Sequence, residues 1–122
     1  MRAVLDASAV LAWLQEEEGA DVVDPLLDGG VMSAANWAEV LQKVMAKDAD
    51  ADATAADLLA VGLTVEPLTE DDGLAVARWW ATDSRLSLGD RCCLALAQRL
   101  AGQAVTADAS WGELPTSVLL IR

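Results

Sequence analysis

Four acidic residues stand where the apolar pattern of the sequence marks the end of a strand or the start of a helix: Asp6, Glu39, Asp90 and Asp108. Ligands of an open parallel sheet bind in the crevice outside the carboxyl ends of the strands, so these carboxylates are expected to converge there. Carboxylates gathered in one crevice repel one another unless a positive charge lies among them. A ligand set made only of oxygens selects a hard cation such as Mg²⁺ or Mn²⁺. The four acids therefore indicate a site for a divalent cation.

Each acid also has a purely local explanation. Ser87 and Asp90 have the spacing of a capping box, in which two side chains satisfy free backbone N–H groups at the start of a helix, and Asn36 and Glu39 repeat that spacing. The acids that end strands could be simple N-caps. On a helical wheel, Glu39 lies nearly opposite the apolar stripe of its own segment. It either reaches the site over the helix end or lies on the surface, and the sequence leaves both alternatives open.

Short apolar runs alternate with segments of helical periodicity along the chain. Strands are predicted at 2–6, 30–33, 62–68, 103–108 and 116–122, and helices at 7–17, 36–47, 69–84 and 87–100. This alternation is typical of an α/β fold with right-handed crossovers. No linker-like tract divides the chain. We therefore expect a single domain over residues 1–122, with a central parallel β-sheet of about five strands and helices on both faces.

The aspartate-rich segment 47–57 imitates the start of a calcium-binding loop. Ala53 stands where such a loop needs glycine, and Leu59 stands where it needs a bidentate glutamate. A solvated connection into a helix with an acidic N-terminus is the better interpretation.

The composition excludes several classes of chemistry. The chain has no histidine, which rules out Ser-His-Asp and Cys-His catalysis and histidine-ligated zinc. Twenty acidic residues against eight basic ones give a formal charge of −12, which repels nucleic acid and favours basic partners. A polyanionic substrate would then need local or metal-mediated contacts. Cys92 and Cys93 are adjacent in an apolar helical pattern and cannot form an ordinary structural disulfide, which fits a reducing compartment.

The apolar runs also bear on where the protein acts. None reaches the roughly 18 to 20 residues of a membrane span, and Asp6 interrupts what would be the apolar region of a signal peptide. We expect a cytoplasmic protein with no membrane partner.

Four stretches, in this order and spacing, carry a resemblance to a known family: "VLDASAVLAWL", "NWAEVLQKV", "LSLGDRCCLALA" and "AVTADASW". Together they closely resemble the PIN-domain ribonucleases, specifically the VapC type toxins of bacterial toxin-antitoxin pairs, over nearly the whole chain. Two departures are slight. Gly89 precedes Asp90 where the family often has alanine, and Trp111 stands near Asp108 in place of the usual downstream aromatic residue.

The resemblance implies a metal-dependent endoribonuclease that hydrolyses RNA phosphodiester bonds with a carboxylate-held Mg²⁺ or Mn²⁺. Asp6, Glu39, Asp90 and Asp108 match the acidic quartet of the family. We expect Asp6 and Asp90 to be the main metal ligands and Asp108 a further ligand. Glu39 is expected to act as a ligand or as a base that orients water.

Contacts to the substrate are expected from three further residues. Ser8 matches the small hydroxyl residue beside the first acid, and Arg85 and Arg91 flank Asp90 as candidates for gripping phosphate. Base stacking would fall to the five tryptophans, the only aromatic residues: Trp13, Trp37, Trp79, Trp80 and Trp111. Most of these are expected in the core or an interface, and the adjacent Trp79 and Trp80 cannot both face inward. The resemblance also implies a small basic antitoxin of the VapB type as partner, and a homodimer.

Three alternatives compete with this reading. A PIN-like subunit that acts only by binding would have lost catalysis, yet the acidic set is complete. A phosphatase would need a second aspartate at the position of Ser8, and a receiver domain would need a lysine after a late strand, which "VTADASWGELP" lacks.

Overall fold

Strands and helices alternate through the whole chain in the computed structural model, which describes all 122 residues. The elements, in order, are β1 (Ala3–Leu5), α1 (Ala7–Leu14), α2 (Ala20–Val23), the 3₁₀ turn η1 (Asp24–Leu26), β2 (Val31–Ser33), α3 (Ala34–Ala46), α4 (Ala51–Ala60), β3 (Thr64–Glu66), α5 (Glu70–Thr82), α6 (Leu88–Arg99), β4 (Gln103–Thr106), the 3₁₀ turn η2 (Ala109–Glu113) and β5 (Val118–Leu120). The predicted strands and helices are found in the predicted order, although each strand is shorter than the apolar run that predicted it and the short helix α2 was not predicted.

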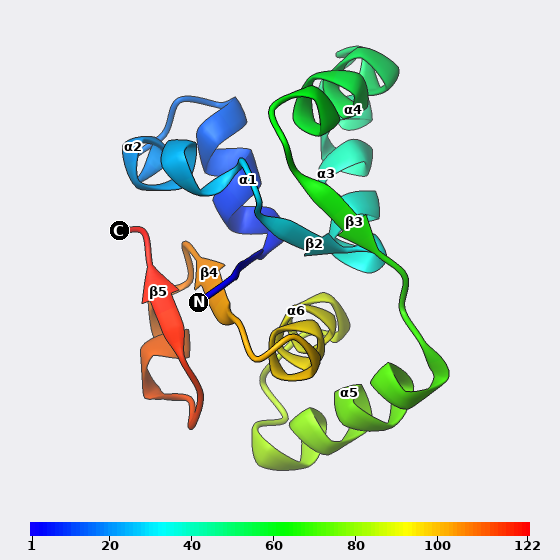
Figure 1. Cartoon of the computed structure of the whole chain (residues 1–122), viewed down its shortest axis with the longest axis vertical. Helices are drawn as coiled ribbons and strands as arrows, with labels where there is room; N and C mark the ends of the chain where they lie inside the picture. Colours follow the sequence, from blue (N-terminus) through cyan, green and yellow to red (C-terminus); the bar gives the residue numbers. More distant parts are fainter.

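The five strands form one parallel sheet in the order β3-β2-β1-β4-β5 (Figure 1). Val4 of the central strand lies between Val31 on one side and Ala104 on the other. The chain runs outward from β1 in one direction to β3, and then returns to add β4 and β5 on the other side. The carboxyl ends of β1 and β4 therefore flank the point where the strand order reverses, which is where α/β sheets place their ligand sites. The predicted α/β class and parallel five-stranded sheet are confirmed.

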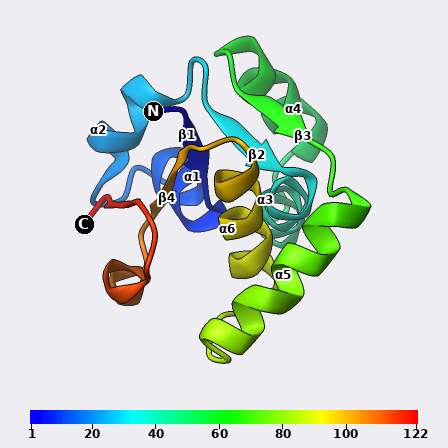
Figure 2. The same ribbon diagram turned by 60° about the horizontal axis from the view of Figure 1, so that its bottom comes forward.

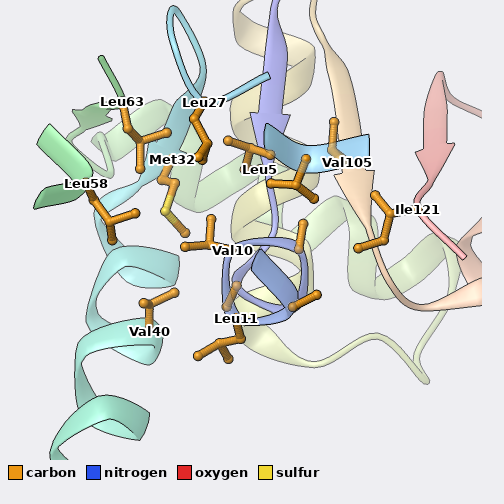
Figure 3. Packing of buried hydrophobic residues seen from close by; sticks show 14 residues of the cluster. Leu5, Val10, Leu11, Leu27, Met32, Val40, Leu58, Leu63, Val105 and Ile121 are labelled. Atoms are coloured by element: carbon orange, nitrogen blue, oxygen red, sulfur yellow. The ribbon is translucent and has the colours of Figure 1, made fainter. Parts of the chain in front are cut away.

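The pleat of the strands divides the core into two layers. Leu5, Met32 and Val105 face one side, where they pack with α1, α2, α3 and α4 (Figure 3). The alternate residues Val4, Val31 and Ala104 face the other side, where α5 and α6 cover the sheet (Figure 2). Trp111 of η2 belongs to this second layer as well. Helices thus cover both faces, as predicted, and the sheet edge that carries the strand ends lies between the two layers.

The helix boundaries correct one expectation. Helix α3 begins at Ala34 and not at residue 36, because the hydroxyl of Ser33 accepts a hydrogen bond from the backbone N–H of Ala35 at 3.2 Å and caps it. Asn36 is therefore inside the helix, and the interpretation of Asn36 and Glu39 as a capping pair is wrong. The acidic connection is a helical start, as expected, since Asp50 caps α4 through the N–H of Ala53.

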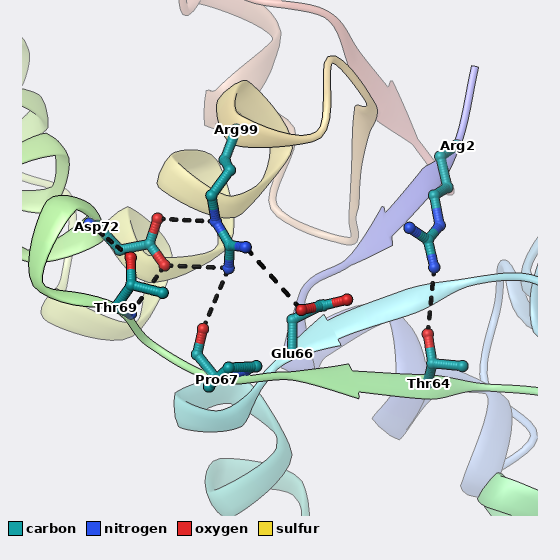
Figure 4. A network of polar contacts seen from close by, with 7 residues as sticks. All are labelled: Arg2, Thr64, Glu66, Pro67, Thr69, Asp72 and Arg99. Atoms are coloured by element: carbon teal, nitrogen blue, oxygen red, sulfur yellow. Dashed lines mark hydrogen bonds and ion pairs between the residues drawn. The ribbon is translucent and has the colours of Figure 1, made fainter.

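A partly buried polar network joins the second helical layer to the edge strand of the sheet (Figure 4). Asp72 forms a capping box with Thr69 at the start of α5, and both of its carboxylate oxygens accept hydrogen bonds at 3.1 Å from the guanidinium of Arg99 on α6. Arg99 also donates to the carbonyl oxygen of Pro67, which follows β3. One arginine therefore connects α6, α5 and the chain leaving the edge strand.

The remaining expectations concern single residues. Trp79 is 4% exposed, whereas its neighbour Trp80 is 57% exposed, so only one of the pair faces inward. Cys92 and Cys93 are both buried free thiols on α6. Among the helices, not one combines the length and the apolar character needed to cross a bilayer.

Candidate active site

Asp6 occupies the centre of the candidate site. It follows the last residue of β1 and is only 5% exposed, and its side chain does not cap α1. Two hydroxyl groups donate to its Oδ2 atom instead: Ser8 Oγ at 2.6 Å and Thr106 Oγ1 at 3.0 Å. Ser8 in turn accepts the N–H of Ala107 at 3.0 Å. The carboxylate is thereby fixed between the ends of β1 and β4.

The environment of Asp6 disfavours its ionised form. Burial is the main cause that raises the pKa of this carboxyl group, and the nearby charge of Asp90 raises it further. The hydrogen bonds from Ser8 and Thr106 lower the pKa but do not outweigh these effects. A buried carboxylate that stays ionised at neutral pH needs a compensating positive charge.

Glu39 reaches the same place from α3. Burial raises its pKa most, and the charges of Asp6 and Asp90 raise it as well, whereas a hydrogen bond from Asn36 Nδ2 to its Oε1 atom at 3.3 Å opposes the rise. The apolar stripe of α3, which includes Val40, packs into the first core layer, while the opposite side of the helix contacts α6. Glu39 is therefore half-buried, with its carboxylate beside Gly89 of α6, so of the two alternatives that the helical wheel left open the structure favours the one in which it reaches the site.

Asp90 is both a helix cap and a member of this group. Its Oδ2 atom accepts the N–H of Ser87 at 2.9 Å, and the hydroxyl of Ser87 accepts the N–H of Asp90 at 3.1 Å. The predicted capping box is thus confirmed. The box uses one carboxylate oxygen, and the charge of Asp90 acts on both Asp6 and Glu39. The cap holds the acid at the start of α6 with its second oxygen unused by the protein.

Asp108 lies at the same edge of the sheet but is more exposed. Its Oδ1 atom caps η2 by accepting the N–H of Ser110 at 3.0 Å, and the hydroxyl of Ser110 donates to the same atom at 2.7 Å. Asp90 and Asp108 line one crevice of about 220 Å³, together with Arg85 and its neighbour Asp83. Asp6, Glu39 and Asp90 are close enough for the charge of Asp90 to raise the pKa values of Asp6 and Glu39. Asp108 lies across a crevice from Asp90.

The two candidate arginines differ in position. Arg85 lines the crevice, is 78% exposed at its side chain and forms a two-bond ion pair with Asp83, which lowers the pKa of Asp83. Arg91 points between α5 and α6, where its Nη1 atom donates to the carbonyl oxygen of Val76 at 3.1 Å. Its Nε atom is buried without a partner, and Arg91 does not line the crevice.

The donor chemistry of the site suits a hard divalent cation, although no three acidic or thiol side chains are arranged so that they already enclose one. The four acids of the site take part in no ion pair with lysine or arginine within 4.0 Å. All their donors are oxygens, and each acid has an oxygen atom that accepts no protein hydrogen bond. Coordination would require these side chains to rotate toward a common point.

Two residues of the site escaped sequence reasoning. Thr106 ends β4, is fully buried and donates to Asp6, and its hydroxyl also accepts the N–H of Asp108 at 3.1 Å. A hydroxyl at the last position of a strand, two residues before an acid, was the available signal. Asn36 is fully buried and joins Glu39 to the carbonyl oxygen of Gly89.

Residues 3–116 match the PIN domain among protein families, and the chain belongs to that family. Three solved structures of toxins or toxin-antitoxin complexes share this fold. A toxin-antitoxin complex from Klebsiella pneumoniae superimposes with a TM-score of 0.83 at 16% identity, covering 98% of each chain. VapBC-1 from nontypeable Haemophilus influenzae gives 0.74 at 18% identity, covering 99% of this chain and 98% of that one. VapC20 from Mycobacterium tuberculosis, described as a sarcin-ricin loop cleaving toxin, gives 0.72 at 18% identity, covering 90% of this chain and 92% of its own. A search of curated protein sequences returned no significant match.

Proposed function

We propose that this PIN-domain protein is a metal-dependent endoribonuclease that acts as the toxin of a toxin-antitoxin pair. The observation that carries the proposal is that Asp6 is buried, that the charge of Asp90 raises the pKa of both Asp6 and Glu39, and that none of these three acids forms an ion pair with a basic side chain. Such a grouping is costly unless a cation shares it. The solved structures of similar fold, one of them a toxin that cleaves the sarcin-ricin loop, support RNA as the substrate.

A bound Mg²⁺ or Mn²⁺ would supply an acidified water and stabilise negative charge on the phosphoryl oxygens. The residues of the chain have distinct parts in this proposal. Asp6 and Asp90 would hold the ion, and Asp108 would contribute from across the crevice. Glu39 is either a further ligand or the base that accepts a proton from the attacking water. Hydrolysis would form a bond between the water oxygen and phosphorus and break the bond from phosphorus to the leaving ribose oxygen, which would keep the bonding electrons and take a proton from solvent.

Three residues are proposed to act on the substrate or on the site from its rim. Ser8 orients the Asp6 carboxylate through its 2.6 Å hydrogen bond. Arg85 lines the crevice and is free to exchange Asp83 for a phosphate group, since the pair is at the surface. Arg91 remains a sequence-based proposal for phosphate contact, which would require its side chain to leave the carbonyl oxygen of Val76.

The test is cleavage of a structured RNA pool by the purified protein. We expect cleavage with Mg²⁺ or Mn²⁺, none in excess EDTA, and a loss of at least about a hundredfold in Asp6→Asn. Glu70→Gln, which changes an exposed acid at the start of α5, is the matched control and should cleave like the wild type. Cleavage that persists in EDTA would contradict the proposed mechanism.

We also propose that a small basic antitoxin of the VapB type inhibits the protein. A groove of about 640 Å³ between α1, α2 and α4 is lined by Trp13 and by four acids: Glu16, Asp21, Asp24 and Asp57. An acidic groove with an aromatic wall suits a basic segment that also carries an apolar anchor. The complexes of similar fold contain toxin and antitoxin together. A homodimer remains a prediction from the resemblance.

Co-expression tests the partner. The chain alone should stop growth of a bacterial host, and a cognate antitoxin should restore it. Asp21→Lys with Asp57→Lys should weaken capture of the antitoxin, whereas Asp71→Lys on α5 should not, because Asp71 lies outside the groove. A chain that is harmless without any partner would contradict the toxin assignment.

A further inference from the structure

The only two lysines of the chain, Lys43 and Lys47, lie on the same side of α3 as Glu39. The three residues are spaced four apart, and side chains with this spacing lie above one another along a helix. Each step of four residues advances about 6 Å along the helix axis. Both lysines are exposed. Positive charge therefore follows the acid of the candidate site at the next two turns of α3.

Lys43 and Lys47 are also free of partners within the protein. Neither forms an ion pair within 4.0 Å or a side-chain hydrogen bond. Every arginine except Arg78 on α5 donates to an oxygen atom of the protein: Arg2 to Thr64, Arg85 to Asp83, Arg91 to Val76, Arg99 to Asp72 and Arg122 to Glu18. In a chain with a formal charge of −12, the two lysines and Arg78 are the basic groups left over for a polyanion.

The lysines line a crevice that begins near the site. Helix α1 starts directly after Asp6 and α3 starts at the end of β2, so both helices leave the carboxyl edge of the sheet. They pack side by side, with Leu11 of α1 and Val40 of α3 in one buried cluster (Figure 3). At the far ends of the two helices, a crevice of about 190 Å³ is lined by apolar residues and by both lysines: Leu11, Leu14, Val44, Lys43 and Lys47. A strand that leaves the site along these helices would pass both lysines.

Electrostatics also connects the lysines to the site. Burial is the main cause that raises the pKa of Glu39, and Lys43 is the only basic residue whose charge lowers it. Lys47, a further turn along the helix, has no such influence. The two lysines therefore differ in their effect on the acids, although both are exposed and unpaired.

We propose that Lys43 and Lys47 bind phosphate groups of the RNA on one side of the cleavage position, and so hold the substrate against a surface that otherwise repels it. This inference rests on the proposed function, because it takes RNA as the substrate. A nucleic acid carries one negative charge at every nucleotide, which suits two cations repeated along a helix. Contacts of this kind position the strand without reading its sequence. The antitoxin groove shares Leu14 with this crevice, so an acidic part of the antitoxin is the alternative occupant.

The experiment is steady-state cleavage of a labelled single-stranded RNA in Mg²⁺ over a series of salt concentrations. The double variant Lys43→Gln with Lys47→Gln should raise KM roughly fivefold or more, because two exposed ionic contacts are lost. The slope of log KM against log salt should fall by roughly 1.4, about 0.7 for each phosphate contact to a single strand. Lys47→Gln alone should show about half of this change in slope, and it leaves the charge beside Glu39 in place.

Two control variants accompany the test. Arg78→Gln removes the same charge from another unpaired basic residue, which lies on α5 away from the crevice, and should keep the KM and the salt slope of the wild type. Lys43→Arg with Lys47→Arg retains both charges and should also keep them. Thermal melts followed by circular dichroism establish that each variant is folded.

The outcomes separate this inference from the proposed function. A wild type that cleaves no RNA with Mg²⁺ or Mn²⁺ would contradict the proposed function, and the role of the lysines would fall with it. A wild type that cleaves, together with glutamine variants whose KM and salt slope match those of Arg78→Gln, would overturn the role of the lysines alone. A loss confined to kcat would overturn it too. Glutamine variants that cleave like the wild type but bind the antitoxin more weakly would overturn it and assign the lysines to the antitoxin interface.

Discussion

Replacing Asp90 with asparagine separates its helix cap from the metal-ligand role that we propose for it. An asparagine oxygen can still accept the 2.9 Å hydrogen bond from the N–H of Ser87, so the cap should survive at a cost well under the ~1 kcal/mol of a lost cap. The substitution also removes a charge that raises the pKa of both Asp6 and Glu39. Each pKa unit of relief contributes about 1.4 kcal/mol to the free energy of unfolding. The metal-free variant should therefore be as stable as the wild type or more stable.

Metal should reverse that order. At free Mn²⁺ of about 100 times the dissociation constant, the wild type gains about 2.7 kcal/mol, which corresponds to a rise in Tm of about 10 °C for a chain of this size. The Asp90→Asn variant should gain much less, because it lacks the second charged ligand. Thermal melts of both proteins in EDTA and in millimolar Mn²⁺ measure the difference. Equal shifts in the two proteins would refute the ligand role and leave Asp90 as a cap only.

Two further predictions follow from the pKa directions. The raised pKa of Asp6 means that ionisation of this carboxyl group destabilises the metal-free protein. The free energy of unfolding of the wild type, relative to that of Asp6→Asn, should therefore fall as the pH rises from about 4 to about 7. Urea denaturation of both proteins measures this difference, and a difference that does not change with pH would contradict the prediction. Burial raises the pKa of Asp72, but the hydrogen bonds from Thr69 and the charge of Arg99 outweigh it, so the net pKa is lowered. Asp72→Ala should then lower the free energy of unfolding by about 2 kcal/mol at neutral pH, a value reduced by solvent screening because the Arg99 side chain is 32% exposed. This loss should shrink at low pH, where Asp72 of the wild type is protonated. An unchanged urea midpoint at neutral pH would contradict the role of this network.

The alternation of strands and helices was predictable because it depends on local periodicity alone. Asp6 and Asp90 were predictable for a related reason. Each marks the boundary of an apolar segment, and the topology of a parallel sheet brings such boundaries to one edge. For Asp90 the cap and the site were posed as alternatives, yet a carboxylate has two oxygens, and the capping box uses only one of them.

The position of Glu39 could not be predicted from the periodicity of its own helix. A helical wheel assumes one buried face, but α3 packs against the first core layer on one side and against α6 on the other. Its polar side is therefore enclosed by an element that is far away in sequence. The same limit applies to Asn36, whose carbonyl partner belongs to Gly89, 53 residues further on. Long-range packing of this kind leaves no periodic signal in the chain.

Arg85 and Arg91 show that residues close in sequence can lie in different places in the structure. Sequence proximity to Asp90 made Arg85 and Arg91 equal candidates for phosphate contact, but side-chain direction separates them. Arg85 lies in the turn before α6, whereas Arg91 is in the first turns of the helix itself. Arg85 reaches the crevice beside Asp108, whereas Arg91 is drawn between α5 and α6 by the carbonyl oxygen of Val76.

Crystals grown or soaked with Mn²⁺ would test the central claim most directly, because the anomalous signal locates the ion without reference to activity. The account predicts a Mn²⁺ peak at coordination distance from the carboxylates of Asp6 and Asp90, with Glu39 turned toward it, and no such peak in crystals of Asp6→Asn. A wild-type map without density between these acids, or with Mn²⁺ only at the exposed aspartates around α4, would contradict it.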